Sequence, residues 1–211
     1  MSKSYYDIVI PLIQGRSVLD VGSVAHYRDS YKIWNFSVLK QHAAKLKGFD
    51  RAAAEVAQAR AEGHDIEIGD AETYIAAEQY DVVFAGDLIE HLSNPGLFLD
   101  CAYKNLTPTG LLIIATPNAY SFAKLARIVG RLTNEPPVNP EHTCYFTPQT
   151  LQQLVVRHAF TRDRVEYCDF QYGPSHGSTR KRLQLAINST LSGLLPSFSQ
   201  TMLAVCSKVA L

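Results

Sequence analysis

Apolar residues along this chain form short continuous runs, and stretches with helical spacing separate them. The runs are rich in Val, Ile, Leu and Phe and end at Gly, Asp or Pro, which is typical of buried parallel strands. The clearest helix between them is the Ala-rich stretch 51–62, which is followed by Gly63 as a helix-ending residue. A short apolar segment, Tyr5–Ile13, comes before the first strand and is predicted to lie against the sheet as a helix or strap.

The order of these elements predicts a fold of class α/β, a doubly wound and mostly parallel sheet. At 211 residues the chain fits a single domain, 1–211, with an insert at about 173–199 before the last strand. The predicted strands are 17–21, 46–49, 65–68, 80–85, 111–116, 160–170 and 202–209; the predicted helices are 30–45, 51–62, 95–104, 119–131 and 148–158.

Charge and cysteine content narrow the class of protein. The formal net charge is zero, so the strong basic patch that nucleic-acid binding needs is missing. The four cysteines show neither CxxC nor Cys/His metal spacing, and Cys101 and Cys206 stand in apolar runs that predict burial. No secretory apolar region and no run of membrane-spanning length is present. We therefore expect a cytoplasmic protein with reduced thiols.

Carboxylates end or follow three successive predicted strands: Asp20, Asp50 and Asp70. Ligands in an open α/β sheet bind outside the carboxyl ends of the strands, where these side chains are expected to lie. Asp20 and the following Gly22 are predicted to form the floor of a small-molecule site, because a glycine lets a ligand approach the backbone closely. Asp50 is placed to accept both hydroxyls of a ribose, and Asp70 to reach an adenine amine. The alternative is that each Asp only stabilises a turn or a helix start.

The loop after the first strand excludes two nucleotide-binding chemistries. A dinucleotide site needs G-x-G-x-x-G to seat its pyrophosphate, and here Gly22 is followed by Ser-Val-Ala-His. No G-x-x-x-x-G-K-[ST] occurs anywhere, so a P-loop is excluded as well. The expected ligand is an adenosine without a phosphate chain.

A second group of polar residues follows the fourth predicted strand, where Asp87, Glu90 and His91 stand within five residues. His91 is a candidate general base near neutral pH, with the two carboxylates adjusting its pKa. Alternatively the three side chains hold a divalent cation together with His142. A purely structural role, in which Glu90 and His91 brace the turn, is the third possibility.

These segments resemble the class I S-adenosylmethionine-dependent methyltransferases, and especially O-methyltransferases of the ubiquinone-biosynthesis type and of polysaccharide gene clusters. VLDVGS is similar to the first motif of that family and GDAE to its adenine-contacting motif. YDVVFAGDLIEHLSNPGLFL, LTPTGLLIIATPN and EHTCYFTPQTL are similar to its strand-four, strand-five and later histidine segments. The resemblance spans about residues 17–154 and implies a seven-stranded Rossmann-like sheet whose last strand is antiparallel.

The resemblance also implies roles for particular residues. S-adenosylmethionine is the expected cofactor, and Mg²⁺ is a further candidate because some relatives bind it through an E-x-x-E-H segment and a downstream His. The corresponding ligands here are Asp87, Glu90, His91 and His142, while Glu90 and His91 are the candidate catalytic residues. The expected cofactor-binding residues are Asp20, Gly22, Asp50, Asp70, Ala71, Gly86, Asp87 and Leu88.

Two positions depart from the family pattern. The first motif usually continues G-x-G-x-G, whereas this chain has Ser23, Val24, Ala25 and His26 after its only glycine, which leaves less room for a methionine chain. Asp87 replaces the usual Glu, which shortens a metal ligand by one methylene. The missing glycines motivate an alternative function, a degenerate methyltransferase-like module that binds a partner without catalysis.

The expected reaction is methyl transfer to a hydroxyl of a small molecule, such as a sugar or a glycan end. We expect the acceptor to be bordered by Asn118, Tyr120 and a Pro-rich lid at 136–142. The insert carries a basic cluster, Arg180 to Arg182, suited to a phosphate or an anionic lipid headgroup. Leu residues beside it predict an apolar helical face that contacts the sheet, a second copy of the chain in a homodimer, or a membrane surface.

Overall fold

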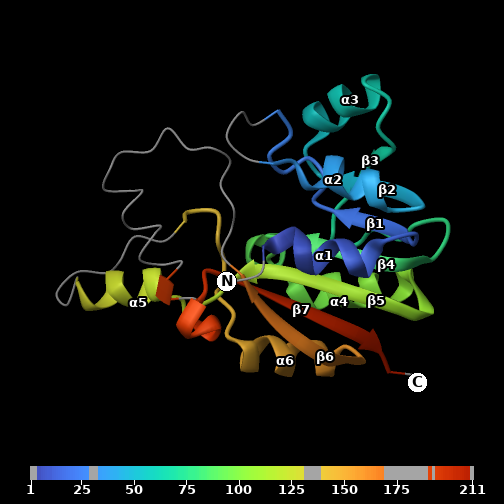
Figure 1. Cartoon of the computed structure of the whole chain (residues 1–211). Helices are drawn as coiled ribbons and strands as arrows, with labels where there is room; N and C mark the ends of the chain where they lie inside the picture. The colour runs from blue at the N-terminus through green and yellow to red at the C-terminus, as the bar shows by residue number, and fades with distance from the viewer. Residues whose placement is uncertain (1–3, 29–32, 131–138, 169–189, 192, 210–211) are drawn as a thin grey trace.

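The computed structural model describes residues 4–28, 33–130, 139–168, 190–191 and 193–209. Over these residues it contains a seven-stranded sheet with strand order β3-β2-β1-β4-β5-β7-β6 (Figure 1). Every neighbouring pair is parallel except those made by β7, which runs antiparallel to both β5 and β6. The predicted fold class, including its antiparallel last strand, is confirmed. The strands are β1 Ser17–Val21, β2 Lys45–Asp50, β3 Ile66–Ile68, β4 Tyr80–Gly86, β5 Leu106–Pro117, β6 Phe160–Cys168 and β7 Thr201–Lys208.

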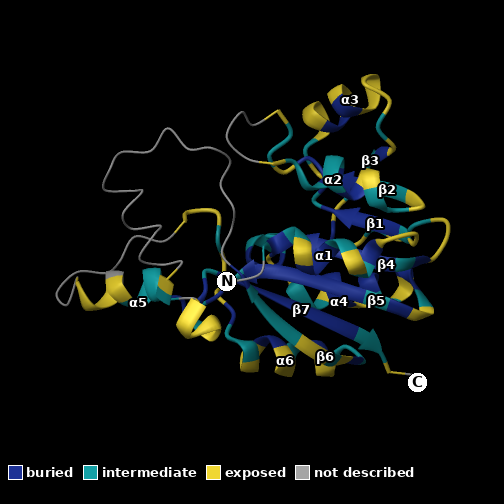
Figure 2. Cartoon of the chain, in the orientation of Figure 1, coloured by how far each residue is buried: buried dark blue, intermediate teal, exposed yellow. Residues whose placement is uncertain are grey.

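Helices cover both faces of the sheet (Figure 1). One face packs against α1 Tyr5–Ile13 and α2 Asn35–His42, and α3 Ala53–Ala61 closes the β3 end of the sheet over Ile66. The opposite face packs against α4 Pro95–Asn105 and α6 Pro148–Arg157. Buried strand residues form the middle layer, and the outer surfaces of α3 and α6 are exposed (Figure 2). Burial of this apolar surface on both sides accounts for the continuous apolar runs in the sequence.

Local signals set several element boundaries. Ser4 and Asp7 form a capping box at the start of α1, so this segment is a helix. Thr147 caps α6 as its sequence position predicts: its hydroxyl accepts a hydrogen bond from the Thr150 amide, and Pro148 occupies the first turn. The predicted helix 30–45 is shorter in the structure, because Trp34 is extended before α2 and Ala43 is extended after it.

The region after β5 differs from the prediction in one respect. The helix expected over 119–131 begins only at Phe122, as α5 Phe122–Val129, because residues 118–121 form a turn. Of the insert at 173–199, residues 190–191 and 193–199 are described, and they include a short 3-10 turn, η2 Pro196–Phe198. The basic cluster expected at 180–182 lies outside the described residues. The described cysteines Cys101 and Cys206 are buried, as predicted.

Candidate active site

The mouth of β1 brings Asp20 and Gly22 to the carboxyl edge of the sheet. Asp20 is 3% exposed, and its Oδ2 atom has no hydrogen-bond partner among the described residues. Burial, and secondarily the charge of Asp50, raises the pKa of Asp20 well above its usual value. Gly22 has a φ of 78°, and a Cβ at this position would lie 3.2 Å from Leu88 Cδ1. The glycine therefore serves both the turn and the close approach of Leu88 from the loop after β4.

Asp50 and Asp70 stand at the next two strand ends, and both carboxylates stabilise local backbone turns. The Asp50 carboxylate accepts hydrogen bonds from the amides of Val24 and Ala52. Asp70 Oδ1 accepts from the Glu72 amide in a turn. Each carboxylate oxygen has a second lone pair, so these turn-stabilising bonds leave both side chains able to accept further hydrogen bonds.

A cavity of about 420 Å³ lies at the mouths of β1 to β4. This volume is within the range of small-molecule sites. Its wall includes all the predicted cofactor-binding residues except Asp20, which is buried and does not line it. The stacked rings of Phe49 and Tyr74, with centroids 3.9 Å apart, support the wall on the β2 side. The predicted residues on the wall are Gly22, Asp50, Asp70, Ala71, Gly86, Asp87 and Leu88.

These residues fit S-adenosylmethionine. The cavity has carboxylates at the strand ends and apolar surface from Ala71 and Leu92, which suits a ribose and a purine. The tight glycine turn and the unsatisfied buried oxygen of Asp20 lie at the β1 mouth, beside the cavity. The glycine-poor loop after β1 is held in place by the Val24–Asp50 bond and by a hydrogen bond from the Trp34 indole to the Ser23 carbonyl.

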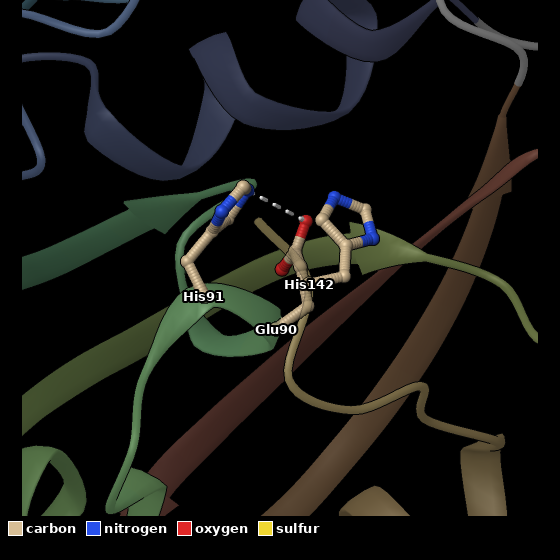
Figure 3. Close-up of side chains that lie close together, drawn as sticks. All are labelled: Glu90, His91 and His142. Atoms are coloured by element: carbon tan, nitrogen blue, oxygen red, sulfur yellow. Dashed lines mark ion pairs between the residues drawn. The ribbon is translucent and has the colours of Figure 1, made fainter. Parts of the chain in front are cut away.

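Beyond β4 a 3-10 turn, η1 Ile89–His91, carries the candidate catalytic residues. Glu90 is 1% exposed, and its Oε2 accepts a hydrogen bond of 2.8 Å from Thr116 Oγ1. Its Oε1 has no hydrogen-bond partner among the described residues. His91 lines the cavity, and its Nε2 lies 4.0 Å from Glu90 Oε1 (Figure 3). Burial, and then the charge of Asp87, raises the pKa of Glu90 to about 7.

His142 joins this pair from a loop that is distant in sequence (Figure 3). One ligand-type atom from each of Glu90, His91 and His142 lies within 4.8 Å of the others, and the two imidazole rings meet edge to face at 4.6 Å. The Nδ1 atom of His142 is buried without a partner in the described part of the chain. Burial, and then the charge of His91, lowers the pKa of His142. The structure thus brings three of the four candidate ligands close together.

The predicted fourth member, Asp87, is not part of this group. It stands at a left-handed backbone position with a φ of 49° and lines the cofactor cavity instead. The group thus offers two imidazoles and one carboxylate, whereas Mg²⁺ prefers six oxygen ligands. Such a donor set suits transition metals such as Co²⁺ or Zn²⁺ better. The structure therefore does not fit the Mg²⁺ site that the sequence suggested.

One expected acceptor contact is wrong. Asn118 is fully buried, and its amide nitrogen donates to the carbonyls of Ser197 and Ser199. Its Oδ1 accepts from the Tyr120 amide, so Asn118 joins the chain around η2 to the end of β5 and does not face an acceptor. Two residues without a predicted role, Thr116 and Thr143, contact Glu90 directly. Their sequence signals were weak: Thr116 is the polar end of an apolar run, and Thr143 follows His142.

Comparisons with known proteins agree with this geometry. The sequence profile described as "Methyltransferase domain" matches residues 7–162. The chain is 29% identical over 117 residues to a ubiquinone biosynthesis O-methyltransferase of Psychrobacter arcticus, covering 53% of the chain and 42% of that relative. It is also 29% identical over 144 residues to a probable S-adenosylmethionine-dependent methyltransferase of Mycolicibacterium smegmatis, covering 67% and 50%. The matches thus span about half the length of these curated relatives.

A solved structure shows the same fold. It is a SAM-dependent methyltransferase from Archaeoglobus fulgidus, with a TM-score of 0.66 and 18% sequence identity, covering 96% of this chain and 91% of that one.

Among the helices of the described residues, none has the length and apolar character needed to cross a bilayer.

Proposed function

The chain belongs to the methyltransferase-domain family, as a class I S-adenosylmethionine-dependent methyltransferase, and on this premise we propose that its acceptor is a hydroxyl group of a small molecule. The observation that carries the proposal is the Glu90–His91 pair: the His91 imidazole lines the cavity, and behind it the buried Glu90 carboxyl has an oxygen without a hydrogen-bond partner among the described residues, 4.0 Å from that imidazole. A hydroxyl must lose its proton as its oxygen is methylated, and this pair can take that proton. The names of the curated O-methyltransferase relatives support an oxygen acceptor.

The residues of the cavity would divide the cofactor between them. Asp50 would accept hydrogen bonds from the ribose, Asp70 and Ala71 would contact the adenine, and Gly22 and Leu88 would border the methionine part. S-adenosylmethionine, when bound, supplies an electrophilic methyl group on its sulfonium. Asp87 lines the cavity just after β4, where its carboxylate complements a cationic ligand.

The proton would pass from the acceptor hydroxyl to the imidazole of His91, which lies on the cavity wall. The carboxylate of Glu90 would then stabilise the resulting imidazolium from 4.0 Å. Because Glu90 has a pKa raised to about 7, this support increases as the pH rises through neutrality. Glu90 does not line the cavity and acts through His91 as a positioning residue. No step is assigned to Mg²⁺, because the donor set does not suit it.

Calorimetry with S-adenosylmethionine and a methyl-transfer assay on a panel of phenols, catechols and sugars test the proposal together. Wild-type protein should bind the cofactor and methylate at least one hydroxyl compound. The variant His91→Asn should retain cofactor affinity and lose activity by about 10²–10⁴-fold. His42→Asn is the matched control, since His42 lies at the end of α2, before the amino end of β2.

Two results would contradict the proposal. Absence of cofactor binding at millimolar concentration would favour the non-catalytic binding module. Methylation of nitrogen acceptors alone would contradict the proposed specificity for a hydroxyl oxygen. Among the hydroxyl compounds, the preferred class in the panel would decide between a ubiquinone-type phenol, as the relatives' names suggest, and the sugar or glycan acceptor considered from the sequence.

A further inference from the structure

Thr143 joins the loop that carries His142 to the turn that carries Glu90 and His91. The Thr143 amide donates a hydrogen bond of 2.8 Å to the Glu90 carbonyl. Its hydroxyl lies 2.7 Å from the Leu92 carbonyl and 3.0 Å from the Glu90 carbonyl, and can donate to both in a shared bond. These contacts span 51 and 53 residues of sequence.

The amide of His142 donates a hydrogen bond of 3.0 Å to the Asn139 carbonyl within its own loop. Its ring meets the rings of His91 at 4.6 Å and Tyr145 at 5.5 Å, and its buried Nδ1 atom has no hydrogen-bond partner among the described residues. The next backbone tie on the carboxyl side is at Phe146, which bridges Asn118 and accepts from the Ala119 amide. The hydrogen bonds of Thr143 are therefore the nearest ties between the backbone beside His142 and the turn of Glu90 and His91, ahead of the Cys144 Sγ contact with the Ile89 carbonyl at 3.9 Å.

We propose that Thr143 is a positioning residue for methyl transfer: through its side-chain hydroxyl it holds the His142 ring against the Glu90–His91 pair. The inference rests on the proposed role of that pair in acceptor activation. Thr143 is not among the residues that line the cofactor cavity. Its effect on the reaction would pass through His142.

The variant Thr143→Val removes the hydroxyl and keeps the size and branching of the side chain. The hydrogen bond from the backbone amide of residue 143 to the Glu90 carbonyl remains, and the hydrogen bond to the Leu92 carbonyl is lost. We expect kcat to fall by about tenfold, the equivalent of one hydrogen bond. The affinity for S-adenosylmethionine should not change, because the residues on the cavity wall keep their contacts. Thr143→Ser restores the hydroxyl and should return kcat to within about twofold of wild type.

Thr147→Val is the matched control, four residues along the same segment. Its hydroxyl accepts from the Thr150 amide at the start of α6 and makes no contact with the histidine group. It should lower the melting temperature and leave kcat unchanged. Histidine ring signals in NMR spectra provide a local readout: the His142 ring signals should shift in Thr143→Val and stay in place in Thr143→Ser and Thr147→Val. If the valine variant does not fold, the pair Thr143→Ala and Thr143→Ser makes the same comparison.

Three outcomes distinguish a failure of the inference about Thr143 from a failure of the proposed function. If His142→Ala is inactive while Thr143→Val retains full kcat and unshifted His142 signals, the inference about Thr143 is wrong and the proposed function stands. If both His142→Ala and His91→Asn retain full activity, the proposed activation group itself is wrong. A fall in kcat for Thr147→Val equal to that for Thr143→Val would show a general effect of loop stability and would also overturn the inference.

Discussion

The stability of Glu90→Gln relative to wild type should increase as the pH rises from 5 to 8. The same variant should reduce methyl transfer. Glu90 is 1% exposed, and burial is the main cause that raises its pKa from 4.5 to about 7. Above pH 4.5 the carboxyl ionises in the unfolded chain while the folded protein keeps it protonated up to about pH 7. The folded state therefore binds more protons in this window, and the stability of wild type falls as the pH rises through it.

The magnitude follows from the size of the pKa shift. A shift from 4.5 to about 7 corresponds to about 3 kcal/mol lost at alkaline pH, since each pKa unit is worth about 1.4 kcal/mol. Between pH 5 and pH 8 the stability difference between the glutamine variant and wild type should grow by about 2–3 kcal/mol. Any constant cost of burying the amide cancels in this comparison. For a chain of this size the difference corresponds to about 4–12 °C in melting temperature.

Urea unfolding of wild type and Glu90→Gln at both pH values measures this difference. Glu141→Gln, which removes an exposed carboxylate from the loop beside His142, is the control for the loss of a negative charge in this region. The Thr116 hydroxyl can still donate to the glutamine carbonyl, so that contact remains available in the variant. A gap for Glu90→Gln that stays constant to within about 0.5 kcal/mol between pH 5 and pH 8 would refute the argument that Glu90 is ionised at a desolvation cost.

Two further predictions concern the cavity and the cation. Gly22→Ala should weaken S-adenosylmethionine binding by about tenfold or more in calorimetry, because Gly22 has a φ of 78° and the new Cβ would meet Leu88. The control is Gly63→Ala, which has a φ of 83° but open space around its Cβ and should cost stability alone. Equal losses of binding in both variants would be evidence against the role of Gly22. After dialysis against chelator, added Mg²⁺ should neither bind the Glu90–His91–His142 group nor change kcat. Added Co²⁺ should give a visible absorption band, and the variant His142→Ala should remove that band. Activity that requires Mg²⁺ would contradict our assignment of the donor set.

The strand ends and the cofactor side of the site could be predicted because their signals are local. A buried parallel strand must be apolar on both faces, so an Asp or Gly at the end of such a run marks the point where the chain leaves the sheet. Parallel strands place these ends at one edge, and that rule alone brings Asp50, Asp70 and Gly86 to one cavity. The helix starting at Pro148 was predictable for a similar reason, since Thr147 caps it from the adjacent position.

Side-chain direction was not predictable in the same way. Asp87 was expected both in the cofactor site and in the metal site; it lines the cavity and stands outside the Glu90–His91–His142 group. Asn118 was expected at the acceptor, but its amide groups bind backbone carbonyls around residues 197–199, about eighty positions later in the chain. One residue of offset in a turn changes the direction of a side chain, and the sequence pattern does not resolve that offset.

By itself, then, the sequence determined the alternating fold, the methyltransferase family and the edge of the sheet at which the cavity lies, because hydrophobic burial and strand-end chemistry depend on neighbouring residues. Only the tertiary structure decided how the Glu90–His91–His142 group is assembled. His142 lies beside Glu90 and His91, and the adjacent Thr143 hydrogen-bonds to their turn, more than fifty residues earlier in the chain. The pKa of Glu90 depends on the same long-range packing, because water is excluded from its carboxyl only when distant segments close over it.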